Sequence, residues 1–213
     1  MKAAIFDMDG TLLDSMGMWY GLAPAFCKKH GIAWSQQIAD DLLGREFPEA
    51  ADYFAERFPF LNMTPEGLIA AWNGMVRFSY LHEVLPKPFA IDYIKQLNRN
   101  NIPCAVATMT NHALADAVLA HHGIAPLVGA VLTPEDVGGI GKERPDIYFE
   151  AARRLGAPVH ECVVFEDTLF AIETAASAGF TVWGVDEPLQ QSQRHIQVAC
   201  HRYVHSFKEL LHD

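Results

Sequence analysis

The chain has 213 residues; half are hydrophobic and 20% are charged, which supplies a sizeable core and excludes wholesale disorder. The formal net charge is −10, so we expect no nucleic-acid-binding surface, and an anionic ligand would need local positive groups to bind. The four cysteines are widely spaced, without a CxxC pair, and we predict that Cys104 and Cys162, in apolar runs, are buried free thiols.

Apolar runs that alternate with helical patterns predict an α/β fold. Residues Ala3 to Phe6 form a short run typical of a strand buried on both faces. Similar runs recur at residues 103–107, 129–132, 162–165 and 181–185, with a weaker one at 203–204. Helices are predicted between them at residues 112–122, 145–155 and about 168–179. This alternation predicts a Rossmann-like, mostly parallel sheet with helices on both faces.

Residues 15–84 interrupt the alternation. The block holds several helical patterns and no convincing strand, and two of the patterns end near Gly31 and Gly44. We therefore predict an inserted all-helical domain at 15–84, and an α/β core made of residues 1–14 and 85–213. Pro86 and Pro88 mark the return to the core.

Two carboxylates follow the first predicted strand, in Asp7-Met8-Asp9-Gly10-Thr11. Open α/β sheets bind ligands beyond the carboxyl ends of their strands. A turn at Gly10 would let both carboxylates face one site and leave backbone N–H groups for an anion. One aspartate can attack phosphorus and the other can act as general acid and base. The alternative is an acidic turn that caps the next segment.

Hydroxyl and amide side chains follow the strand predicted at residues 103–107, in Thr108-Met109-Thr110-Asn111. Such groups, just before a helix N-terminus, are natural donors to phosphate oxygens. These four residues, together with Gly10 and Thr11, are candidate phosphate-binding residues, although Asn111 is also a good ordinary N-cap.

A lysine and an acidic pair complete the candidates. Lys142 follows a glycine-rich loop and precedes a helix, where it can neutralise a phosphoryl group and hold the nucleophile, or can be a solvated loop lysine. Glu166 and Asp167 follow the strand at 162–165. Buried acidic groups are costly unless they are paired or metal-bound, and oxygen ligands suit Mg²⁺; helix capping is the alternative.

All four motifs fall at or just beyond predicted strand ends. Together they supply a nucleophile, a proton carrier, phosphate donors and cation ligands, the last being Asp7, Asp9, Glu166 and Asp167. A Mg²⁺ ion there would offset the repulsion between a phosphate and an attacking carboxylate. The combination predicts Mg²⁺-dependent hydrolysis of a small phosphorylated metabolite.

On these motifs the chain resembles, over essentially its whole length, the haloacid dehalogenase superfamily of phosphohydrolases, in the branch of β-phosphoglucomutase-like phosphatases. The resemblance implies that Asp7 is the nucleophile, Asp9 the acid and base, Thr108 a phosphate-binding residue and Lys142 the lysine of the family. The acidic pair matches the family's metal motif. The resemblance also implies an aspartyl-phosphate intermediate, and a helical cap at 15–84 that closes over the site and selects the substrate.

Several residues depart from the family pattern. Trp19 stands where sugar phosphomutases carry a cap histidine, and Phe47, with Arg45 nearby, stands where they carry an arginine. Glu143 replaces the usual proline after the loop lysine, and Phe89 replaces a glycine. We expect Trp19 and Arg45, together with Ser15, to contact the substrate; the alternatives are a place in the core of the helical block for Trp19 and an exposed surface position for Arg45.

Other functions stay open as alternatives. A sugar phosphomutase is the main one. A phosphonate-cleaving relative would need a cap lysine, for which only Lys28 and Lys29 are available. A dehalogenase would lack Asp9, and a non-catalytic binding module would be expected to lose Asp7 or Asp9.

The sequence shows no signal-peptide hydrophobic region and no apolar stretch long enough to span a membrane. We therefore expect a cytoplasmic protein, a monomer or weak dimer, that binds neither membranes nor nucleic acid.

Overall fold

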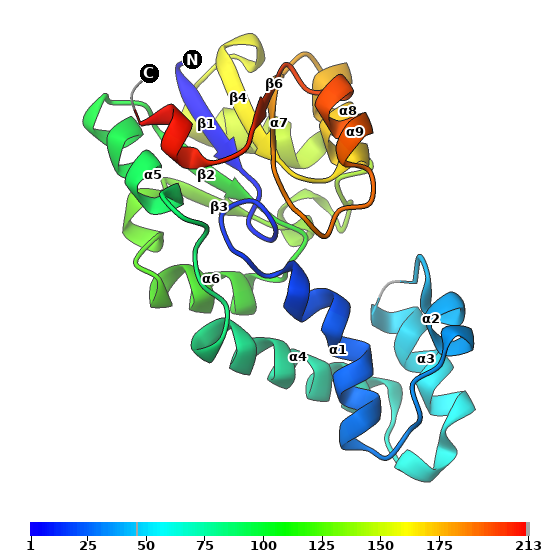
Figure 1. Cartoon of the computed structure of the whole chain (residues 1–213). Helices are drawn as coiled ribbons and strands as arrows, with labels where there is room; N and C mark the ends of the chain where they lie inside the picture. The colour runs from blue at the N-terminus through cyan, green and yellow to red at the C-terminus, as the bar shows by residue number, and fades with distance from the viewer. Residues whose placement is uncertain (46, 212–213) are drawn as a thin grey trace. The chain divides into compact units, whose positions relative to one another are not determined.

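The computed structural model describes residues 1–45 and 47–211, which fall into two compact units (Figure 1). The first unit comprises Met1–Met16 and Val84–Asp213, and the second comprises Gly17–Glu83. The helical block expected at residues 15–84 corresponds to the second unit, except that its first two residues and its last belong with the first unit. Within the described ranges, no helix is long and apolar enough to cross a membrane.

The first unit is built on a six-stranded, fully parallel sheet with the strand order β3-β2-β1-β4-β5-β6. The strands are β1 (Ala3–Phe6), β2 (Cys104–Ala107), β3 (Ala130–Leu132), β4 (Cys162–Glu166), β5 (Thr181–Val185) and β6 (Arg202–Val204). This confirms the predicted Rossmann-like sheet. Phe6 of β1 pairs with Val106 on one side and Phe165 on the other, so the carboxyl ends of β2, β1 and β4 lie next to one another.

Helices connect the strands; those at His112–His121, Asp146–Leu155 and Leu169–Ser177 lie where the sequence predicts them, and the other two were not predicted. The connecting helices are α5 (Ala90–Arg99), α6 (His112–His121), α7 (Asp146–Leu155), α8 (Leu169–Ser177) and α9 (Gln193–Ala199). Asn111 caps α6, because its side chain accepts a hydrogen bond from the N–H of Leu114 at 3.1 Å. Gly156, with a left-handed φ of 67°, ends α7.

Helices cover both faces of the sheet. One face packs on α7, α8 and α9, through side chains such as Ile147, Ile172 and Ile196. The other face carries an aromatic cluster in which Phe6 and Phe165 stack, with ring centroids 4.4 Å apart, beside Tyr93 of α5. Cys104 and Cys162 are buried free thiols, as predicted.

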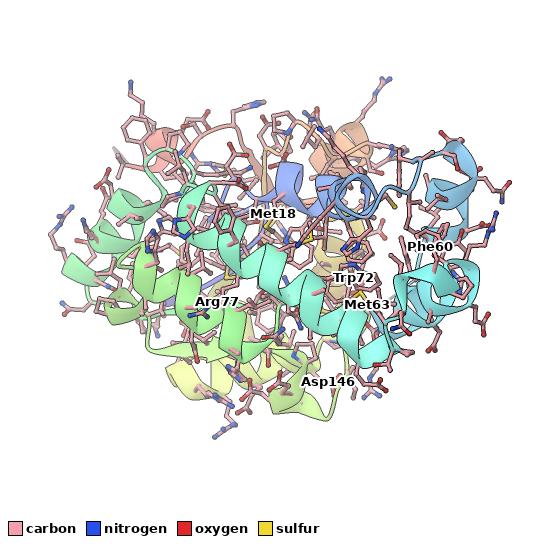
Figure 2. The ribbon with its side chains drawn as sticks, turned by 90° about the horizontal axis from the view of Figure 1, so that it is seen from below. Met18, Phe60, Met63, Trp72, Arg77 and Asp146 are labelled. Atoms are coloured by element: carbon pink, nitrogen blue, oxygen red, sulfur yellow. The ribbon has the colours of Figure 1, made fainter. Side chains whose placement is uncertain are left out.

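The second unit consists of helices around an aromatic core. Its elements are α1 (Met16–Lys29), which begins in the first unit, α2 (Gln36–Leu42), α3 (Phe47–Arg57), η1 (Pro59–Leu61) and α4 (Pro65–His82). Phe26, Phe54 and Trp72 contact one another edge to face, with ring centroids 5.5 to 5.7 Å apart. Figure 2 shows α4 along its length, with Met63 just before its start and Trp72 and Arg77 further on.

Two chain segments of the first unit lead to and from the second unit, and they are hydrogen-bonded to each other. Leu13 forms an antiparallel bridge with Pro86. The N–H of Asp14 donates to the Leu85 carbonyl at 2.9 Å, and the N–H of Lys87 donates to the Leu12 carbonyl at 2.8 Å. The chain therefore leaves and re-enters this unit at one place.

Phe89 follows shortly after this return. It has a φ of 67° at the start of α5, in the left-handed region where the family pattern has a glycine. Its half-exposed ring lies 5.8 Å from the Lys208 ammonium.

Candidate active site

The turn after β1 places the first aspartates. Asp7 comes directly after Phe6 and is 6% exposed, and its N–H donates to the Phe165 carbonyl of β4 at 2.9 Å. The carbonyl of Met8 then accepts hydrogen bonds from the N–H groups of Leu12 and Leu13. These bonds close a compact turn that fixes Asp7 at the centre of the sheet edge.

Gly10 is required in this turn for two reasons. Its φ is 83°, a conformation that L side chains rarely adopt, and an added Cβ would lie 2.8 Å from Cγ of Asp167 and closer still to its Oδ2. The Gly10 N–H donates to the Leu13 carbonyl at 2.9 Å. The turn itself therefore uses the Gly10 N–H, and the expectation that backbone N–H groups of this turn face an anion stays a prediction.

Lys142 lies between two carboxylates. It is 3% exposed, and its ammonium donates to Oδ1 of Asp7 and, at 2.7 Å, to Oε2 of Glu166. The hydroxyl of Tyr148, from the first turns of α7, donates to the same Glu166 oxygen at 3.1 Å. The other oxygen of Glu166 accepts from the N–H groups of Asp167 and Thr168, both at 3.3 Å. Lys142 is thus not a solvated loop lysine.

Asp167 is 1% exposed and is held from two sides. The Thr11 hydroxyl donates to Oδ1 at 3.0 Å, and the Gln190 amide donates to Oδ2 at 3.0 Å. The Thr11 hydroxyl is thus engaged by this carboxylate, and its expected contact with phosphate stays a prediction.

Tyr148 and Gln190 are the site residues that the sequence reasoning missed. A tyrosine on the apolar face of a predicted helix, beside Ile147, could have signalled a buried hydroxyl in need of a partner. Gln190 lies in a loop after β5, and no local pattern marks it.

The carboxylate of Asp9 is held by two hydroxyls. Ser15 donates to Oδ1 at 2.7 Å, and Thr110 donates to Oδ2 at 2.8 Å. The Thr110 N–H donates to the buried Thr108 hydroxyl oxygen at 3.1 Å, which ties the end of β2 to the same place. Asn111 caps α6 with its side chain, so it has the alternative role considered for it.

One remaining candidate and one departure from the family pattern can also be placed. Met109 is 44% exposed at the end of β2. Glu143 accepts the Gly141 N–H at 3.1 Å, which gives this departure from the family pattern a structural role in shaping the loop before Lys142.

Trp19 and Arg45 belong to the second unit. The Trp19 ring packs against Phe47 and Tyr80, with centroids 6.1 and 6.4 Å away. The Arg45 side chain donates to the Asp41 carbonyl and lies 5.5 Å from the centre of the Tyr53 ring. Their contact with a substrate stays a prediction.

The electrostatics of the buried cluster are dominated by negative charge. Burial, and then the Glu166 carboxylate, raise the pKa of Asp7 well above its usual range, despite the opposing effect of Lys142. Burial and Glu166 likewise raise the pKa of Asp167 to about 7. Burial alone would lower the pKa of Lys142, but the carboxylates of Asp7 and Glu166 outweigh it and keep the amine protonated. Three carboxylates thus face one ammonium, so the cluster has a net charge of −2 when all four groups are ionised.

This set of groups suits a hard divalent cation. Among the described residues, Asp7, Glu166 and Asp167 form an acidic group whose ligand oxygens lie within 4.8 Å of one another. Carboxylate oxygens are the ligands that Mg²⁺ prefers, and two positive charges would balance the cluster. The Asp9 carboxylate is not part of this group, so its predicted role as a side-chain ligand has no support from this geometry and stays a prediction.

Comparison with known proteins identifies the family. The sequence pattern of the haloacid dehalogenase-like hydrolases matches residues 1–179. The chain belongs to this family of hydrolases. The hydrolase is 32% identical over 175 residues to the fructose-1-phosphate phosphatase YqaB of Escherichia coli, a match that covers 82% of this chain and 91% of that protein. It is 29% identical over 194 residues to hexitol phosphatase A of the same organism, covering 88% of this chain and 84% of that one.

Solved structures agree with the fold. A hydrolase of this family from Deinococcus radiodurans, solved with bound phosphate and sodium, superposes with a TM-score of 0.73 at 25% identity, covering 99% of this chain and 93% of that one. The relatives named above are phosphatases, and the present hydrolase is an enzyme of the same type, acting on phosphoric monoesters.

Proposed function

We propose that the enzyme is a Mg²⁺-dependent phosphatase that hydrolyses a small phosphomonoester, a sugar phosphate or a similar metabolite, through an aspartyl-phosphate on Asp7. The observation that carries the proposal is the arrangement at the end of β1. There the buried Asp7 carboxylate is paired with the Lys142 ammonium, and Asp9, two residues further on, is held by two hydroxyl groups.

Each residue at the end of β1 has a separate role in the proposed reaction. Asp7 attacks phosphorus while Asp9 donates a proton to the departing alcohol, and Asp9 then removes a proton from the water that hydrolyses the aspartyl-phosphate. Ser15 and Thr110 orient the Asp9 carboxylate for both steps. Lys142 orients Asp7 and places positive charge beside the transferring group.

Asp7 and Asp167, with Glu166 beside them, would hold the Mg²⁺ ion, because their buried oxygens supply the ligand chemistry and the excess negative charge. When bound, the ion would reduce the repulsion between the phosphate and the attacking carboxylate. Glu166 would keep Lys142 in place through its 2.7 Å ion pair in the same cluster.

We propose further that the second unit acts as the cap that selects the substrate. Relatives named for fructose 1-phosphate and hexitol phosphates support a sugar phosphate as the first class to test. Trp19 and Phe47, at the positions where sugar phosphomutases carry a histidine and an arginine, pack against each other with ring centroids 6.1 Å apart. Two packed aromatic rings replace the polar pair, which favours a phosphatase over a mutase.

The experiment is a screen of phosphate release from sugar phosphates, nucleotides and other small phosphate esters, with Mg²⁺ and with a chelator. We expect release that needs Mg²⁺ and falls by a factor of about 10³ or more in Asp7→Asn. Asp14→Asn is the matched control, because Asp14 is exposed and its hydrogen bond to Leu85 uses only the backbone. That variant should retain the activity.

Three outcomes would contradict the proposal. The first is release that persists in Asp7→Asn, and the second is an aspartyl-phosphate that still forms in that variant. The third is phosphate transfer to an added sugar in preference to water, which would identify a mutase.

A further inference from the structure

Gln190 supplies one of two matched hydrogen bonds to Asp167. Its amide donates to Oδ2 and the Thr11 hydroxyl donates to Oδ1, each at 3.0 Å. A carboxylate oxygen can accept more than one hydrogen bond or metal bond, so both contacts are compatible with a bound cation. With one donor on each oxygen, rotation of this buried carboxylate is restricted.

The loop that carries Gln190 is itself held in place. It lies between β5 and α9, and its Glu187 is 2% exposed. Oε1 of Glu187 accepts the N–H of Leu189 at 3.1 Å, and the Glu187 carbonyl accepts the N–H of Gln190 at 3.0 Å. The loop therefore turns around the Glu187 residue and presents the next polar side chain, Gln190, to the sheet edge.

A buried ion pair ties this loop to the rest of the unit. The Lys87 ammonium lies 3.0 Å from Oε2 of Glu187 and also donates to the Asp186 carbonyl. Lys87 is 12% exposed and belongs to the segment paired with Leu12. Removing one partner of such a buried pair leaves the other charge uncompensated, so the loop depends on both.

We propose that Gln190 is a positioning residue that orients the Asp167 carboxylate toward Mg²⁺, and that the Lys87–Glu187 ion pair keeps Gln190 within reach of it. The inference rests on the proposed function, because it assumes that Asp167 binds the ion. Groups that hydrogen-bond metal ligands fix the orientation of those ligands, and their loss typically weakens metal binding by about 10- to 100-fold.

The test is calorimetric titration of MgCl₂ into the full-length wild type and into Gln190→Leu, which keeps the side-chain size and removes the donor. We expect Mg²⁺ binding to weaken about 10-fold or more, and the Mg²⁺ concentration for half-maximal phosphatase activity to rise by a similar factor. Gln191→Leu is the matched control, because Gln191 is the exposed neighbour of the same type. Lys87→Met should also weaken Mg²⁺ binding, because it removes the ion pair that holds the Gln190 loop.

The titration distinguishes a failure of this inference from a failure of the proposed function. Equally tight Mg²⁺ binding by the wild type and Gln190→Leu overturns this inference alone, as does an equal loss in Gln191→Leu. A wild type that binds no Mg²⁺ overturns the proposed function and this inference with it. A denaturant transition of Gln190→Leu close to that of the wild type shows that any lost affinity is not a loss of folding.

Discussion

Replacing Gly10 by alanine tests how tightly the turn after β1, which carries Asp7 and Asp9, is built. The substitution has two separable costs. The first is conformational, because a φ of 83° places an alanine in the left-handed region at a cost of about 1 to 2 kcal/mol. The second is steric, because the new Cβ would lie 2.8 Å from Cγ of Asp167 and 3.0 Å from its Oδ1.

The steric cost can be estimated from the contacts of Asp167. Non-bonded atoms prefer separations of about 3.5 to 4 Å, so the carboxylate must move by roughly 1 Å. Its hydrogen bonds from Thr11 and Gln190 are both 3.0 Å long, and such a shift breaks at least one of them. A hydrogen bond to a charged group contributes about 1.5 to 3 kcal/mol. We therefore expect Gly10→Ala to cost about 3 to 5 kcal/mol in the free energy of unfolding.

Gly123→Ala is the matched control. Gly123 has a φ of 69° after α6, and an added Cβ would meet nothing within 4 Å, so only the conformational cost of about 1 to 2 kcal/mol applies. Urea denaturation at pH 8, with and without Mg²⁺, measures both variants. Mg²⁺ should stabilise the wild type and Gly123→Ala but not Gly10→Ala. If both variants lose the same free energy of unfolding and Mg²⁺ still stabilises both, the predicted clash with Asp167 is refuted.

Three further predictions concern buried or strained positions of the first unit. Tyr148→Phe removes the donor to the buried Glu166 and is expected to cost about 1 to 2 kcal/mol in urea denaturation; a change below about 0.3 kcal/mol would mean that this hydrogen bond is not needed. Phe89→Gly should be more stable than Phe89→Ala by about 1 kcal/mol, since both lose the ring and only glycine relieves the φ of 67°. A Phe89→Ala variant that is the more stable of the two, as alanine is within helices, would contradict this. Without Mg²⁺, the stability of the wild type relative to Asp167→Asn should fall as pH rises from about 4 to 7. The reason is that burial and Glu166 raise the pKa of Asp167 to about 7 in the folded state, against about 3.9 when unfolded, so the folded state binds the extra proton in this range. If the difference in free energy of unfolding between the two proteins does not change with pH across this range, the prediction is wrong.

The sequence predicts the sheet well because its strands are buried on both faces. Runs such as Cys162 to Phe165 are continuously apolar, and the helices between them have recognisable ends, such as Asn111 before α6 and Gly156 after α7. Local patterns therefore suffice for the elements, and the parallel arrangement follows from their alternation.

The site is predictable only in part. Strand ends identify Asp7 and Asp167 as neighbours, because a parallel sheet brings those ends to one edge, and Lys142 reaches them from the loop before α7. The hydrogen bonds among them are not predictable in this way. Gln190 reaches Asp167 across 23 positions of sequence, from a loop that the Lys87–Glu187 ion pair joins to a distant segment. The hydroxyl of Thr11 is likewise used by the protein, which only the folded contacts reveal.

The paired segments at Leu13 and Pro86 make the intervening helices separable from the sheet. Because the chain leaves and returns at adjacent, hydrogen-bonded positions, residues 17–83 could be exchanged for a different insert, or for a short turn, without changing the strand order. In such an arrangement, sequence change in the insert need not disturb the acidic cluster, and the turn after β1 need not change when the insert does. If the second unit selects the substrate, as proposed, evolution could vary what is recognised while conserving how it is hydrolysed.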